Sequence, residues 1–162
     1  MNVRRRRRTQ LLLDSQLLLL LCAGLAGRTN IEKHKRLQAF DAVDFDLLVE
    51  IIGRFAVLMV TPNIVTETSN LLRFGSQDER LSLALATGLQ EWVEVYRPSR
   101  SAVQHRAYAR LGLSDVVMLD VLKGRDDTIL LTADVDLYIA GQYEGLQVEN
   151  FNHIRDGRND FR

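Results

Sequence analysis

Short apolar runs of strand length alternate with segments of helical periodicity along most of this chain, and this alternation constrains its fold more than any other feature. Continuous apolar runs fall at 10–13, 56–60 and 128–132, with shorter strand-like stretches at Trp92–Tyr96 and Leu146–Val148. Strands that are apolar throughout are typical of parallel sheets that are covered on both faces. The sequence therefore predicts an α/β fold, with three α/β/α layers built around a central parallel sheet.

The segments between these runs carry apolar residues at helical spacing or begin with helix-capping residues. Thr61 is a good N-cap with Pro62 at the first helical position, and Ser114 is expected to cap a later helix. The polar, basic segment 28–35 is expected to be a loop. Helices are expected at 15–26, 41–55, 61–74, 77–90, 99–110, 114–123 and 137–143.

The size and composition of the chain suit one domain with one core, since 46% of its 162 residues are hydrophobic. We expect a basic disordered tail at 1–9, one domain at 10–150 and a frayed C-terminal tail at 151–162. Cys22 is the only cysteine, so an internal disulfide is excluded and a reduced, cytoplasmic setting is expected.

Charge is unevenly spread although the formal net charge is zero. Five of the 21 basic residues fall at 4–8, which leaves a net acidic body. This arginine run could hold phosphates or could be a solvated tail. The basic start followed by Leu11–Leu21 also mimics a secretion signal, but Asp14 interrupts the apolar run, and the remainder is too short to span a bilayer. We therefore expect no membrane association.

Four carboxylates stand at the ends of apolar runs or beside expected helix starts: Asp14, Glu67, Asp115 and Asp134. Ligands of parallel α/β sheets bind beyond the carboxyl ends of the strands, where Asp14 and Asp134 would lie. Glu67 and Asp115, in the first turns of their helices, could face the same crevice. Converging carboxylates repel one another unless a cation lies between them. Oxygen ligands without a nearby histidine or cysteine pair favour Mg²⁺ or Mn²⁺, and indicate hydrolysis of a phosphodiester by metal-activated water.

Each of these residues also has a plainer interpretation. Asp14 could cap a helix, Asp134 could be a turn residue, and Glu67 and Asp115 could simply favour a helix dipole. Ser15 could support the site or merely start a helix, and Asp136 could contribute to the site or cap a helix. The three histidines, His34, His105 and His153, lie in polar surroundings and are expected at the surface.

A basic stretch with aromatic neighbours follows the fourth expected helix. Its arginines could contact a phosphate backbone or form a solvated face, and its aromatic rings could stack on bases or belong to the core. The residues are Trp92, Tyr96, Arg97, Arg100, Arg106, Tyr108 and Arg110.

Four fragments in this order resemble the PIN domain family: Leu-Leu-Leu-Asp-Ser at 11–15, Thr-Pro-Asn-Ile-Val-Thr-Glu-Thr-Ser-Asn at 61–70, Leu-Gly-Leu-Ser-Asp at 111–115 and Leu-Leu-Thr-Ala-Asp-Val-Asp-Leu at 130–137. The resemblance covers nearly the whole chain from about residue 10. It implies a Rossmann-like nuclease that cuts single-stranded RNA or flap-like nucleic acid with Mg²⁺ or Mn²⁺. The segment 27–55 is longer than in the smallest members, and the arginine run at 4–8 is not a family feature.

The resemblance also assigns roles to residues of this chain. Asp14, Glu67, Asp115 and Asp134 correspond to the acidic metal-binding set, Thr132 to a hydroxyl residue before the last acid, and Asp136 to a possible additional acid. Many small members are toxins of VapBC-type toxin–antitoxin pairs, so an antitoxin protein and a homodimer are expected as partners. The alternative is a PIN-like module that binds RNA or protein without cutting.

Overall fold

The computed structural model of the protein describes residues 10–73 and 79–159. The expected basic tail at 1–9, including the arginine run, lies outside the described residues. So do residues 74–78 and the last three residues of the expected C-terminal tail.

A five-stranded, all-parallel sheet forms the centre of the molecule, in the order β3-β2-β1-β4-β5. The strands are β1 (Gln10–Leu13), β2 (Val57–Val60), β3 (Val93–Glu94), β4 (Thr128–Thr132) and β5 (Val148–Asn150). The chain starts in the middle of the sheet, builds outward through β2 and β3, and then returns to the other side of β1 to form β4 and β5. The strand order therefore reverses between β1 and β4, which is where open α/β sheets bind ligands.

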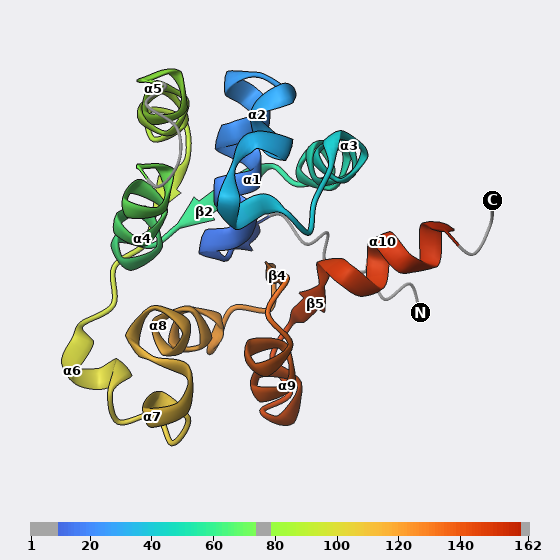
Figure 1. The fold of residues 1–162 in the computed structure, drawn as a ribbon. Coiled ribbons are helices and arrows are strands. Elements are labelled where there is room, and N and C mark those ends of the chain that lie inside the picture. The colour runs from blue at the N-terminus through green and yellow to red at the C-terminus, as the bar shows by residue number, and fades with distance from the viewer. Residues whose placement is uncertain (1–9, 74–78, 160–162) are drawn as a thin grey trace.

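Helices cover both faces of this sheet, which confirms the expected three-layer α/β/α architecture (Figure 1). One layer holds α1 (Ser15–Ala26), α2 (Thr29–Lys33), the 3₁₀ turn η1 (Lys35–Leu37), α3 (Ala42–Ile52), α4 (Pro62–Leu72) and α5 (Glu79–Gly88). The other holds α8 (Leu113–Leu122) and α9 (Val135–Tyr143), with the short α6 (Ser99–Ala102) and α7 (Tyr108–Leu111) beside α8. Helix α10 (Phe151–Asn159) directly follows β5.

Helix α1 is buried on all sides, since every residue from Leu17 to Gly24 is buried. It packs against α3, α4 and α5 while its apolar side chains also join the core beneath the sheet. A helix that is apolar all round is typical of such a central position. The apolar run that mimics a secretion signal therefore folds as the central helix of its layer. Among the described residues, no helix is long and apolar enough to cross a membrane.

Several expected element boundaries are wrong. Segment 28–35, expected as a loop, contains α2, because Ile31 is fully buried against the core. The helix expected at 99–110 is two short helices, α6 and α7. Ser114 does not cap α8, since this helix already begins at Leu113, after Gly112.

The segment expected to be a frayed tail instead forms α10 as far as Asn159. Phe151 is fully buried and its ring centroid lies 6.1 Å from that of Phe40. Arg155 extends from α10 over the same Phe40 ring and lies 3.3 Å from the carboxylate of Asp44. These contacts fix α10 to the start of α3, so most of the C-terminal segment is part of the domain.

Candidate functional site

Asp14 occupies the turn between the central strand β1 and the buried helix α1. Its Oδ1 accepts the backbone N–H of Leu17 at 2.8 Å, so it is the N-cap of α1. Its Oδ2 accepts the hydroxyl of Thr132 at 2.5 Å and the backbone N–H of Ala133 at 2.8 Å. The side chain is almost completely buried, and this burial raises the pKa of Asp14 despite the three hydrogen bonds.

Thr132, the last residue of β4, connects Asp14 with Asp134. Its Oγ1 accepts the backbone N–H of Asp134 at 2.9 Å, while the same hydroxyl points to Asp14 Oδ2. A hydroxyl has a single proton, so Thr132 must donate it to the Asp14 carboxylate. The parallel register places Leu13 beside Leu131, which aligns the ends of β1 and β4 for this contact.

Asp134 begins helix α9. Its Oδ1 accepts the backbone N–H of Leu137 at 2.9 Å, so it is the N-cap of α9, while its side chain remains exposed. The negative charge of Asp134 raises the pKa of Asp14, after the larger effect of burial. Asp14 and Asp134 are therefore neighbours that each cap a helix, at the edge of the sheet where the strand order reverses.

Asp115 lies in the first turn of α8 and is half-buried. Gly112, the N-cap residue, has a φ of +87°, a conformation that a residue with a side chain rarely adopts. Burial, followed by the charges of Asp134, Asp14 and Glu67 in that order, raises the pKa of Asp115 to about 7. The charges of three predicted acids therefore act on the fourth, Asp115, although the four come from separate segments of the chain.

Glu67 approaches from α4, in the layer on the other side of the sheet from α8. Thr61 caps this helix with Pro62 at its first position, as predicted, but Glu67 lies in the second turn rather than the first. The neighbouring Thr68 is buried and its hydroxyl donates to the carbonyl of Ser15 at 3.5 Å. This contact links α4 to the start of α1, next to Asp14.

A cleft of about 430 Å³ opens beside Glu67. Its lining is largely polar and combines one face of α4 with the start of α8: Pro62, Asn63, Thr66, Glu67, Asn70 and Ser114. Glu67 is therefore accessible to a ligand from this side.

The two supporting residues have different positions. Ser15 is the first residue of α1 and contacts α4 through its backbone carbonyl. Asp136 lies exposed in the first turn of α9, and its charge is not among those that raise the pKa of Asp115. Its expected capping role belongs to Asp134. The expected capping role of Asp14 is confirmed, and Asp134 is a helix N-cap rather than a turn residue. Their assignment to a metal site stays a prediction.

Sequence patterns gave no indication of two features of the structure. The backbone N–H of Ala133 is a donor to Asp14, and a backbone donor has no residue-type signal. His34, expected at the surface, is only 1% exposed. Its Nδ1 accepts the backbone N–H of Arg36 at 3.2 Å, and its Nε2 lies 3.1 Å from the carbonyl of Leu71 at the end of α4.

The acidic set is not a preformed metal cage. Within residues 10–73 and 79–159, no three acidic, histidine or cysteine side chains are positioned as they stand to hold a metal ion together. Comparisons of the chain with protein-family models, with curated proteins and with solved structures found no match.

Proposed function

We propose that this protein is a PIN-like, metal-dependent ribonuclease that hydrolyses phosphodiester bonds of single-stranded RNA. The observation that carries the proposal is the meeting of four carboxylates at the point where the strand order reverses. Asp14 and Asp134 are joined through Thr132, and their charges act together with that of Glu67 on Asp115. Such a group is costly to maintain unless a cation or a reaction uses it.

The donor chemistry fits Mg²⁺ or Mn²⁺, since every candidate ligand is a carboxylate oxygen. Asp14 and Asp115 would be the central ligands, with Glu67 and Asp134 completing the shell directly or through water. When bound, the ion would polarise the scissile phosphate and lower the pKa of the attacking water.

The surrounding residues prepare these carboxylates for binding. The hydrogen bonds from Thr132 and Ala133 fix one Asp14 oxygen, and the cap to Leu17 fixes the other, so the Asp14 plane cannot rotate freely. Asp115, with a pKa raised to about 7, readily gives up a proton when a cation arrives. The exposed side chains of Glu67 and Asp134 are free to adjust to the ion and to RNA.

Toxin activity belongs to the same proposal and is supported by the resemblance of the four fragments alone. On that basis we propose a cognate antitoxin protein, a homodimer and a cytoplasmic location. A small reading frame for a DNA-binding protein directly beside the gene would support the antitoxin.

The proposal is tested by incubating the purified protein with labelled single-stranded RNA and Mg²⁺ or Mn²⁺. We expect cleavage that EDTA abolishes and that excess Mn²⁺ restores. Cleavage that persists in EDTA would contradict metal dependence. Absence of cleavage across a panel of RNAs, with RNA binding retained, would favour the non-catalytic binding module.

A further inference from the structure

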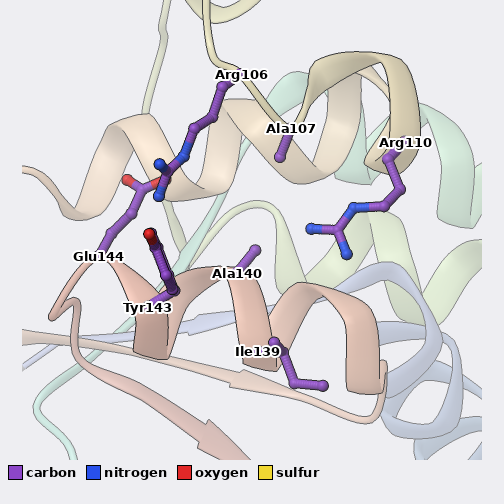
Figure 2. A pocket seen from close by; sticks show the side chains of 7 residues that line it. All are labelled: Arg106, Ala107, Arg110, Ile139, Ala140, Tyr143 and Glu144. Carbon is purple, nitrogen blue, oxygen red and sulfur yellow. The ribbon is translucent and has the colours of Figure 1, made fainter.

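A second cleft, of about 320 Å³, lies between α7 and α9, and none of the four acids lines it (Figure 2). Its walls carry two arginines and a tyrosine, and its floor is formed by small and aliphatic side chains. The lining residues are Arg106, Ala107, Arg110, Ile139, Ala140, Tyr143 and Glu144.

The side chains that line this cleft are of the kinds that can bind a nucleotide. The Arg106 guanidinium lies 4.4 Å from the centroid of the Tyr143 ring, and Figure 2 shows Arg110 extending toward α9 from the other end of the cleft. Tyr143 is 75% exposed, and Ile139 beside it is 51% exposed. A base can pack on this aromatic and aliphatic surface while its phosphate contacts an arginine.

Arg110 is the strongest candidate for a phosphate contact. Within the described part of the chain, its guanidinium makes no ion pair or hydrogen bond, although it lines a cleft. Arg106 is already engaged in the cleft, because its guanidinium lies over the Tyr143 ring. An oxygen of the Glu144 carboxylate lies 2.5 Å from the Nε2 of His105.

Both walls of the cleft lead to the acidic residues. Helix α9 begins at Asp134 and ends at Tyr143, a distance of about 13 Å along its axis at the usual helical rise. Helix α7 continues through Gly112 into α8, whose first turn carries Asp115. A single strand with one phosphate at the acids can therefore follow α9 and place a nearby nucleotide in the cleft.

We propose that the Arg106–Arg110–Tyr143 cleft binds a nucleotide of single-stranded RNA that flanks the bond to be cut. Arg110 contacts the phosphate and Tyr143 stacks with the base. This inference rests on the proposed function for its substrate, but RNA binding by the cleft does not require cleavage.

The test measures binding of a labelled single-stranded RNA by fluorescence anisotropy in EDTA, where metal-dependent cutting cannot occur. The variants are Arg110→Gln, Arg106→Gln and Tyr143→Leu. Arg36→Gln, in η1 of the opposite helical layer, is the matched control, because it removes an equal charge from an exposed position. All four positions are exposed, so the folds of these variants should be retained.

We expect Arg110→Gln to weaken binding several-fold and to reduce the slope of log K against log salt by about 0.7, the value for one phosphate contact to a single strand. Arg106→Gln should have a smaller effect, and Tyr143→Leu should weaken binding by about fivefold or more. Arg36→Gln should bind like the wild type.

An unchanged affinity and salt slope in Arg110→Gln would overturn the inference, and so would a wild type that binds no RNA. Loss of affinity in the arginine variants alone would replace the nucleotide assignment with a plain phosphate contact. Because binding and cutting are scored separately, a protein that binds through this cleft but never cuts would contradict the nuclease proposal only.

Discussion

The hydroxyl of Thr132 lies 2.5 Å from Oδ2 of Asp14 and donates its only proton to that carboxylate. This contact joins the ends of β1 and β4, which are separated by more than a hundred residues of chain. It also couples Asp14 to Asp134, whose backbone N–H donates to the same hydroxyl. Thr132 is thus the one side chain among the three donors that orient Asp14, the other two being backbone N–H groups.

Replacing Thr132 by valine should therefore destabilise the protein. The valine keeps the shape but removes the donor to a buried carboxylate, for which we expect a loss of about 1–3 kcal/mol in the free energy of unfolding. Urea denaturation measures this loss. Thr132→Ser, which retains the hydroxyl, is the matched control and should lie close to the wild type. Equal stabilities of the valine variant and the wild type would show that the contact contributes nothing.

The metal-free protein should become more stable relative to Asp115→Asn as the pH falls. The pKa of Asp115 is about 7 in the folded state and near its ordinary value of 3.8 when unfolded. The folded protein therefore binds a proton that the unfolded chain does not between about pH 7 and pH 4, and its stability rises as the pH falls through this window. Above this window the ionised carboxylate destabilises the fold.

Thermal unfolding in EDTA, measured at several pH values, tests this linkage. At about pH 8 we expect Asp115→Asn to be more stable than the wild type, by up to a few kcal/mol. This advantage should shrink toward about pH 5. A difference between the two proteins that does not change with pH would mean that Asp115 is solvated and remote from the other acids.

Divalent metal should stabilise the folded protein through the acidic set. A ligand that binds only the folded state raises the unfolding temperature. We expect MgCl₂ or MnCl₂ to do so more than NaCl at equal ionic strength, and Asp134→Asn to reduce the shift. Asp136→Asn, two residues along the same helix, is the control and should retain it. If the metal raised the unfolding temperature equally in both variants, Asp134 would not be part of the metal site.

His34 should stabilise the protein in its neutral form. Burial lowers the pKa of His34, because the folded protein disfavours the charged imidazole. The stabilisation by the neutral imidazole is therefore fully present above the unfolded pKa of 6.5, and it is lost as the pH falls from there through the lower pKa of the folded state. His34→Leu leaves the carbonyl of Leu71 and the N–H of Arg36 without their partner, for an expected cost of about 1–3 kcal/mol. Urea denaturation measures this cost. The exposed His153→Gln is the control, and a similar stability of both variants would contradict the account.

The sequence predicted the central parallel sheet, and the strand ends that carry Asp14 and Asp134, because these depend on local signals. The apolar runs of β1 and β4 are completely or almost completely buried. A strand that is apolar throughout is typical of the centre of a parallel sheet that is covered on both faces. Thr61 and Pro62 define the start of α4 by their own chemistry. Asp14 follows β1 directly and Asp134 follows β4 after one residue, so parallel pairing alone brings them to one edge.

The remaining features depend on contacts between distant segments. Nothing next to His34 in the chain indicates that it is buried against Leu71, and the polar neighbours of Ile31 hide the buried face of α2. The polar composition after Phe151 likewise resembled a tail, yet Phe40 and Asp44 supply its partners. The arginine cleft required α7 and α9 to be placed side by side.

The most direct test of the central claim compares single-turnover RNA cleavage by Asp115→Asn and Asp136→Asn in saturating Mn²⁺. Both substitutions remove one carboxylate, but only Asp115 lies within the field of the other three acids. We expect Asp115→Asn to reduce the cleavage rate by about a hundredfold or more, and Asp136→Asn to cut at nearly the wild-type rate. Undiminished cleavage by Asp115→Asn would contradict the assignment of the acidic set as the catalytic centre.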